Sequence, residues 1–216
     1  IMEGSVGWGD AMIMIPYYYW KRYGDDSLIR KYWTNMCKCF SFYAKRIGKR
    51  NLFSLFSPKH GKYSRYLCAC GRDFGEWTEP DDCAPSKIGL LTPHPEESTA
   101  YIAYDAGLMA EMASYLGKEN SAEKYADLAS KLREAYQYYF LKDGNFDTDR
   151  MCKYVRPCAL HLTNEKLRKK LIAHIVDLNQ KRNFRVGTGF LSTPFVAELL
   201  TEGGAADDAL KMILNP

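Results

Sequence analysis

The chain has 216 residues, which is enough for one domain with a sizeable core. Its 30 Lys and Arg residues against 26 Asp and Glu leave a net charge of +4 that is spread along the chain, which excludes the clustered basic face of a nucleic-acid-binding protein. No apolar run reaches the roughly 18 residues that a membrane span needs, so no membrane partner is expected.

The first half of the chain predicts two helices and then a long irregular segment. A first helix covers residues 10–23 and ends at Gly24, and a second starts at the Asp25–Asp26 pair and runs to about Ile47. Residues 49–94 contain many prolines and glycines and show no long period. A long irregular segment inside a compact domain is usually functional, so we expect it to form a site.

The second half predicts six more helices. Residues 96–116 carry one apolar stripe, and the Asn120-x-x-Glu123 pattern resembles a capping box that starts the next helix. We expect Asn164 to cap a later helix and Thr193-Pro194 to start another, with proline at a favoured first position. The remaining two helices are expected at residues 150–161, interrupted by Pro157, and at about 205–213.

Helices in pairs with no visible strand predict an all-α fold. Either an α-solenoid or an (α/α) toroidal barrel buries such pairs. The chain shows no internal repeat of the kind that a solenoid requires, and its long loop at about 49–94 fits a barrel better. We therefore expect residues 1–216 to form one barrel-type domain.

The seven cysteines show no regular framework, and their odd number favours free thiols. Free thiols favour the cytoplasm, but the sequence leaves the compartment unknown. Cys68 and Cys70, with Cys83 and His60, could be interpreted as a metal site, but the C-x-C spacing is not that of structural zinc. We expect no metal and no cofactor.

Two short stretches contain residues suited to cleaving and binding sugars. Glu3 and Asp10 flank Trp8 in a glycine-rich stretch, and glycoside hydrolysis needs two carboxyl groups across the scissile bond. In the second stretch, Glu76 and Trp77 lie inside the long irregular segment, and an aromatic ring can hold a sugar. Taken alone, the first pattern fits an ordinary helix start and the second a loop anchored by a buried tryptophan.

In chain order, these stretches resemble the α-L-rhamnosidases of glycoside hydrolase family 78. The resemblance runs essentially end to end and rests on Glu3–Ala11, Tyr23–Asp25, Phe74–Trp77 and Thr188–Pro194. It implies an (α/α)6 toroidal barrel with a site built from loops at one end. It also implies inverting hydrolysis of terminal α-L-rhamnosides, with a rhamnose-containing glycoside or oligosaccharide as the substrate.

The resemblance implies a role for five residues. Glu3 matches the general acid, because its spacing of seven to Asp10 is kept. Trp8 and Asp10 match sugar-contacting positions, although the family often has one more residue between them. Trp77 matches an aromatic residue of the rhamnose pocket. Glu76 stands where the family usually has Asp, so we expect it at the substrate site, in contact with the sugar or supporting a residue that is.

The resemblance also implies that part of the machinery lies elsewhere. In the family, the general base Glu and a sugar-binding His follow the point where this chain stops. We therefore expect an excised piece, an incomplete barrel of about eight helices that is inactive by itself and could self-associate through its exposed core. Other acids are weaker candidates for the base: Asp73, Glu79, Asp81, Asp82, Glu96 and Glu97.

Two interpretations from other classes stay open. A non-catalytic helical scaffold that binds protein predicts that Glu3, Trp8 and Trp77 are scattered over different faces. A sugar-binding remnant that does not cleave its ligand suits the missing base.

Overall fold

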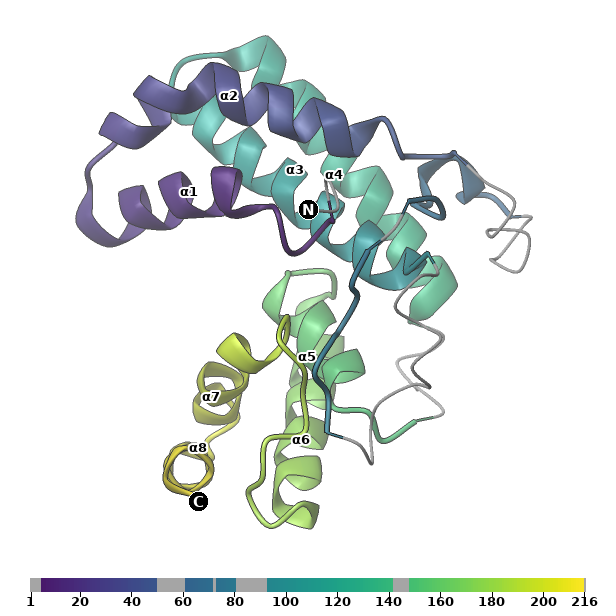
Figure 1. Cartoon of the computed structure of the whole chain (residues 1–216), viewed down its shortest axis with the longest axis vertical. Coiled ribbons are helices and arrows are strands. Elements are labelled where there is room, and N and C mark those ends of the chain that lie inside the picture. Colours follow the sequence, from purple (N-terminus) through teal and green to yellow (C-terminus); the bar gives the residue numbers. More distant parts are fainter. Residues whose placement is uncertain (1–4, 50–60, 72, 81–92, 142–147, 216) are drawn as a thin grey trace. The chain divides into compact units, whose positions relative to one another are not determined.

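The computed structural model describes residues 5–49, 61–71, 73–80, 93–141 and 148–215 (Figure 1). Regular structure in these ranges consists of eight α-helices and a short 3-10 turn at Ser64–Tyr66, with no strand. The all-α prediction is therefore confirmed. The helices form two compact units: the first comprises Ile1–Asp73 and Leu91–Tyr139, and the second comprises Phe74–Leu90 and Phe140–Pro216.

The first unit is built from α1 (Ala11–Tyr23), α2 (Ser27–Ala44), α3 (Pro95–Tyr115) and α4 (Glu119–Phe140). The helices α1 and α2 lie side by side as a hairpin, and both pack against α3 (Figure 1). Gly24 ends α1 as predicted, with a φ of 70° and its N–H donating to the Trp20 carbonyl. The predicted apolar stripe of α3 is buried, which makes α3 the core helix of this unit.

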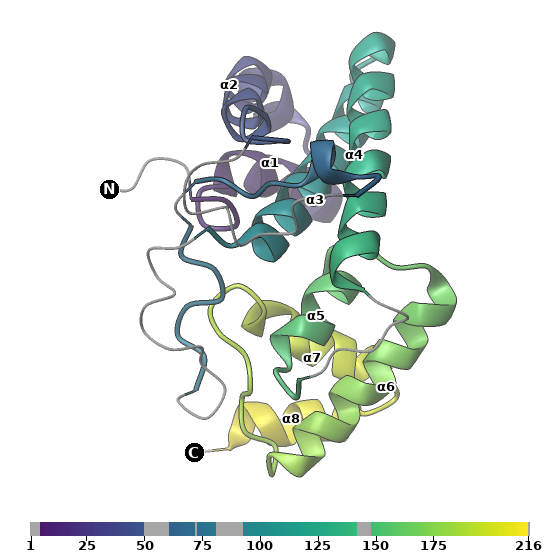
Figure 2. The same cartoon turned by 90° about the vertical axis from the view of Figure 1, so that its right-hand side faces the viewer.

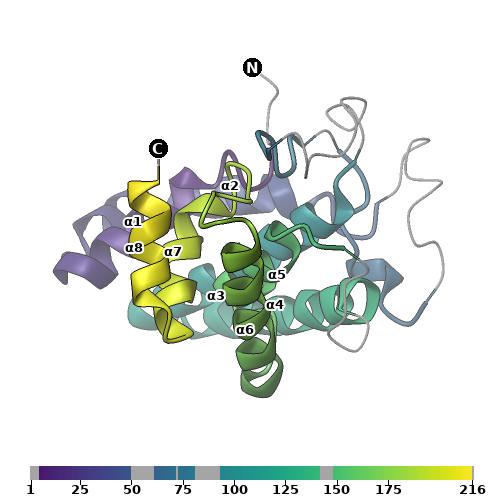
Figure 3. The ribbon, with the colours of Figure 1, turned by 90° about the horizontal axis from the view of Figure 1, so that it is seen from below.

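The second unit is built from α5 (Cys152–Ala159), α6 (Glu165–Lys181), α7 (Thr193–Glu202) and α8 (Ala206–Leu214). All four contribute side chains to one buried apolar cluster. Figure 2 shows the four helices of this unit grouped together. The helices α7 and α8 lie next to each other (Figure 3). Asn164 caps α6 as predicted, because its side-chain oxygen accepts the Leu167 N–H at 2.9 Å.

Three helix predictions were wrong in detail. The helix α2 ends at Ala44, and the chain passes through turns to Gly48. The capping box at Asn120 does not form, because α4 already begins at Glu119 and the Lys118 carbonyl accepts its first amide bonds. Pro157 lies inside α5 without interrupting it. Pro157 is the sixth of the eight residues of α5, and a proline there removes a single backbone bond.

The irregular segment at 49–94 is only partly described. Its described residues contain the 3-10 turn and no α-helix before Pro95, while residues 50–60, 72 and 81–92 lie outside the described part. Six cysteines are described and all are free thiols, as predicted; Cys83 is not described. None of the described helices is long and apolar enough to cross a membrane. The prediction of a single domain concerns both units together and stays a prediction.

Candidate functional site

Glu3 lies outside the described residues, but the turn that follows it is described. Within Ser5–Asp10, the amides of Trp8 and Gly9 both donate to the Ser5 carbonyl oxygen, at 3.3 and 2.9 Å. Gly7 has a φ of 82°, a conformation that favours glycine. A Cβ atom at Gly9 would overlap the Tyr43 hydroxyl. The glycines therefore allow a tight turn directly after the candidate acid.

Two buried carboxyl groups hold consecutive amides of this turn. Asp73 Oδ1 accepts the Val6 N–H at 2.9 Å, and Asp10 Oδ2 accepts the Gly7 N–H at 2.8 Å. Asp73 is itself held by Arg46, whose two terminal nitrogens donate at 3.0 and 2.6 Å, and by the hydroxyl of Ser98. The position of the turn is thus fixed by the core of the first unit.

The first helix was predicted to start at Asp10, and Asp10 is the N-cap residue of α1, but its side chain does not cap the helix. The carboxyl group turns back to Gly7 and is only 1% exposed. Burial raises the pKa of Asp10 to about 7, although the Gly7 amide favours the charged form. Direct contact of Asp10 with a sugar stays a prediction.

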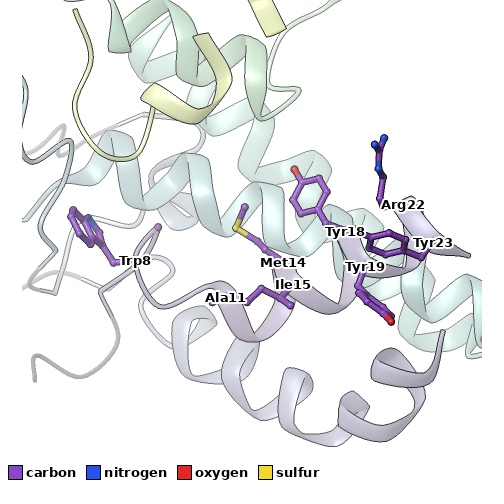
Figure 4. Close-up of a pocket in the computed structure, with 9 residues that line it drawn as sticks. Trp8, Ala11, Met14, Ile15, Tyr18, Tyr19, Arg22 and Tyr23 are labelled. Atoms are coloured by element: carbon purple, nitrogen blue, oxygen red, sulfur yellow. The ribbon is translucent and has the colours of Figure 1, made fainter. Parts of the chain in front are cut away.

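Trp8 lies at one end of an apolar groove on α1. The groove has a volume of about 560 Å³ (Figure 4), and its other lining residues are Gly7, Ala11, Met14, Ile15, Tyr18, Tyr19, Arg22 and Tyr23. Figure 4 shows Trp8 well apart from the tyrosines at the far end of the helix. Aromatic rings with polar tips suit a sugar, and equally the face of another helix.

In the second unit, Glu76 is buried and makes three hydrogen bonds. Its Oε2 accepts from Arg156 at 2.7 Å and from the Ser192 hydroxyl at 2.8 Å, and its Oε1 accepts from the Ser192 amide at 2.8 Å. Arg156 is 1% exposed, so this is an ion pair inside the protein. Glu76 thereby ties the 74–77 loop to the 188–194 loop, and its contact with a sugar stays a prediction.

Trp77 is 46% exposed, although its own backbone is fixed. Its ring stacks on Phe74 with 5.5 Å between the centroids, and its carbonyl accepts the Phe190 N–H at 2.8 Å. A Cβ atom at Gly189 would overlap the carbonyl oxygens of Glu76 and Trp77. Glycine is therefore required where the two loops meet, and the Trp77 ring is presented on a rigid support.

The described acids that could replace a missing base have structural contacts. Glu79 pairs with Arg150 and accepts from the Cys152 thiol at 3.0 Å. Glu96 accepts the Tyr136 hydroxyl at 3.0 Å, in the first turn of α3. Asp81 and Asp82 lie outside the described residues. Beside Glu79, burial lowers the pKa of Lys153 to about 7.

The described residues that the sequence predicted for the site fall into both units. Trp8 and Asp10 belong to the first, and Glu76 and Trp77 to the second. Sequence reasoning missed the residues that support them: the partly buried Arg46 and the buried Asp105, Arg156 and Ser192. Asp105 carried a usable signal, because it lies three residues after Ile102 and four before Met109, on the apolar stripe of α3.

Residues 1–216 match the family described as bacterial α-L-rhamnosidase 6 hairpin glycosidase domain. The chain is 29% identical over 212 residues to an α-L-rhamnosidase of Streptomyces avermitilis, covering 98% of this chain and 18% of that protein. It is 25% identical over 213 residues to one of Formosa agariphila, covering 98% and 21%. The chain thus spans about a fifth of the length of these relatives.

Solved structures show the same fold. The Streptomyces avermitilis α-L-rhamnosidase complexed with L-rhamnose aligns with a TM-score of 0.73 at 28% identity, over 96% of this chain and 18% of that one. The native α-L-rhamnosidase of Aspergillus terreus aligns with a TM-score of 0.71 at 17% identity, over 96% and 23%. These matches confirm the predicted barrel type of fold.

Proposed function

We propose, since this chain belongs to the bacterial α-L-rhamnosidase six-hairpin glycosidase domain family, that it is part of the catalytic domain of an inverting glycoside hydrolase. The substrate that we propose is a terminal α-L-rhamnoside in a glycoside or oligosaccharide. Support comes from the match over residues 1–216 and from two curated relatives, both named α-L-rhamnosidases, that cover 98% of the chain.

In this proposal Glu3 is the general acid, which gives its proton to the leaving oxygen. The observation that carries the assignment is the turn directly after Glu3, where two buried carboxyl groups hold the amides of Val6 and Gly7. A catalytic acid has to be kept in place, and a short chain segment anchored a few residues further on limits how far it can move. We place the general base outside residues 1–216 and expect the isolated chain to be inactive.

The sugar is bound by aromatic faces. Trp77 is exposed and rigidly mounted, so it can stack against the CH face of rhamnose, and Trp8 is proposed as a second contact. Glu76 supports Trp77 through Ser192 and Arg156. The turn with Asp10 completes the proposed sugar contacts.

Kinetics on Glu3→Gln in the full-length protein test the assignment. An alkyl α-L-rhamnoside, whose leaving group needs a proton, should lose about 10²- to 10⁴-fold in kcat, and an aryl rhamnoside with an acidic phenol should lose less. Glu119→Gln, at the exposed start of α4, is the matched control and should leave kcat unchanged. Equal, near-normal turnover of both substrates by the Glu3→Gln variant would contradict the role of Glu3.

The stereochemical outcome is a second, independent measurement. An inverting enzyme releases β-L-rhamnose first, and proton NMR taken before mutarotation distinguishes it from the α anomer. Initial release of the α anomer would rule out inversion. A protein that binds L-rhamnose in calorimetry and yet cleaves no rhamnoside would instead be a sugar-binding remnant.

A further inference from the structure

Asp10 and Asp105 form a buried pair of carboxyl groups without enough hydrogen-bond donors. Asp105 lies in the middle of α3 and is 0% exposed, while Asp10 is 1% exposed. Each carboxyl group affects the pKa of the other, so the two lie close together. Oδ1 of Asp10 and both carboxyl oxygens of Asp105 receive no hydrogen bond from the N–H and O–H groups of the described residues. Buried polar atoms almost always have a partner, so these three oxygens need an explanation.

Among the described residues, the groups that act on the pair carry no positive charge. The groups that act on its titration are Tyr43 and Cys39 of α2 and, more weakly, Asp73. Tyr43 is close enough to favour the charged form of Asp10 but not in hydrogen-bond geometry with Oδ1. Arg46, the cation next to Asp73, is already bonded to both Asp73 oxygens.

Two adjacent negative charges are unfavourable inside the protein when no positive charge lies beside them. Burial disfavours the charged form of each group, and each charge repels the other. Burial accordingly raises the pKa of Asp10 to about 7, and burial together with the Asp10 charge raises the pKa of Asp105 well above its usual value. One bound proton removes the repulsion and supplies a donor, which joins two of the three oxygens in one hydrogen bond.

We propose that Asp10 and Asp105 hold one proton between them, and that Asp105 is a positioning residue for the turn after Glu3. This role of Asp105 rests on the proposed function. The proton bonds the two carboxyl groups together, while Oδ2 of Asp10 stays available to the Gly7 amide. The core helix α3 is thereby connected through Asp10 to the turn that follows the candidate acid in the sequence.

The two anchors of the turn then differ in their response to pH. Asp73 holds Val6 as an ion pair with Arg46, whereas Asp10 holds Gly7 as half of a protonated pair. Loss of the shared proton leaves two carboxylates side by side inside the protein, and only the second anchor is weakened. Asp105 thus sets an upper pH limit on the position of the turn.

Infrared difference spectroscopy on the full-length protein at pH 6 tests the pair. The wild type should show the carbonyl band of a buried protonated carboxyl group, and Asp105→Asn and Asp10→Asn should each lose it. Asp127→Asn, on the exposed face of α4, is the matched control and should keep the band. A wild type without this band would overturn the proposal.

Chemical unfolding from pH 4 to pH 7 gives a second test. In the folded protein the pair keeps a proton that an unfolded Asp loses near its ordinary pKa of 3.8, so the contribution of the pair to stability is fully present below pH 4 and is lost as the pH rises towards 7. The folding constant of the wild type, divided by that of Asp105→Asn, should therefore fall up to about tenfold per pH unit. A ratio that is independent of pH would contradict the shared proton.

The positioning role is tested by rhamnoside cleavage at pH 6. Asp105→Asn keeps a polar partner for Asp10 and should stay within about threefold of wild-type kcat/KM, whereas Asp105→Leu should lose more than about tenfold. Above pH 7 the wild type should lose activity relative to Asp105→Asn, and the titration of Glu3 cancels in that ratio. If the proposed function fails, the wild type cleaves no rhamnoside while the band and the pH-dependent stability remain. If the enzyme is active and the wild type and Asp105→Asn have identical pH profiles, the positioning role of Asp105 is wrong and the proposed function still stands.

Discussion

Ser192 donates two hydrogen bonds to the carboxylate of Glu76, one from its backbone amide and one from its hydroxyl, both at 2.8 Å. The two residues are 116 positions apart in the sequence, and both are buried. The same carboxylate takes a third bond from Arg156. The rigid presentation of Trp77 depends on this junction.

Replacing Ser192 with Ala should destabilise the protein moderately. The variant removes one charge-assisted bond and keeps the amide bond, which corresponds to about 1.5–3 kcal/mol of unfolding free energy. Urea unfolding measures the loss. Thr201→Val, which removes a hydroxyl that donates to the Ala197 carbonyl on an exposed face of α7, should cost clearly less. Equal losses in the two variants would mean that the hydrogen bond to Glu76 contributes no more to stability than an exposed one.

Arg156→Met should be more damaging than Ser192→Ala. It leaves the Glu76 carboxylate buried without its only cationic partner among the described contacts, and breaking a buried pair in this way costs about 3–5 kcal/mol. The double variant Arg156→Met/Glu76→Gln removes the stranded charge and should recover part of the loss. Unfolding curves of the two single variants and the double variant decide this, since purely additive losses would exclude coupling between the residues.

Gly189→Ala should push the two loops of the second unit apart. The new Cβ would overlap the backbone carbonyls of Glu76 and Trp77, and backbone atoms cannot move aside as a side chain can. We expect a loss of about 1–3 kcal/mol and a shift in tryptophan fluorescence. Gly107→Ala in α3 meets no atom within 4 Å and is the matched control. Alanine should be neutral there, or stabilising by up to about 1 kcal/mol.

Trp77→Ala should affect substrate binding more than stability. The ring is almost half exposed, so its removal costs little burial, but it removes the proposed stacking surface for rhamnose. The loss of one stacking contact, about 0.5–1.5 kcal/mol, should raise KM about three- to tenfold. Tyr138→Ala removes a similarly exposed ring from α4 and should leave KM unchanged. A Trp77 variant with wild-type KM and lower stability would make the ring a loop anchor.

The lowered pKa of Lys153 predicts that the stability of the protein rises between neutral and alkaline pH. Burial lowers its pKa to about 7 in the folded protein, whereas an unfolded lysine titrates near 10.5. Between these values the unfolded chain binds the extra proton, so raising the pH favours the folded state by up to about 1.4 kcal/mol per unit. Lys153→Met should flatten the pH dependence of the unfolding free energy over this range. If the unfolding free energy of the variant keeps the same pH dependence, groups other than Lys153 cause it.

The local patterns predicted the helices well, because each depends on nearby residues. Asn164 caps the helix that it precedes, and Gly24 has the positive φ that ends α1. The errors came from the same short range: Asn120 had the right spacing for a capping box, but the chain was already helical from Glu119. A cap pattern identifies several neighbouring residues that could start a helix, and the packing of the whole helix selects one of them.

The partners of the site residues could not be predicted in this way. Nothing near Glu76 in the sequence points to Ser192, and nothing near Val6 points to Asp73. Asp105 could have been identified as a charge on a core stripe, but Asp10 was already interpreted as a helix start and a sugar contact. Residue types indicated the chemistry, while the supporting contacts arise only when distant segments fold together.

The buried thiols offer a way to watch each unit open separately. Cys68 belongs to the first unit and Cys158 to the second, and burial raises the pKa of each to about 12. A maleimide reagent attacks the thiolate, so neither cysteine should react until its own surroundings open. Mass spectrometry that identifies which cysteine is labelled first would then give an opening free energy for each unit from one sample, without any introduced probe.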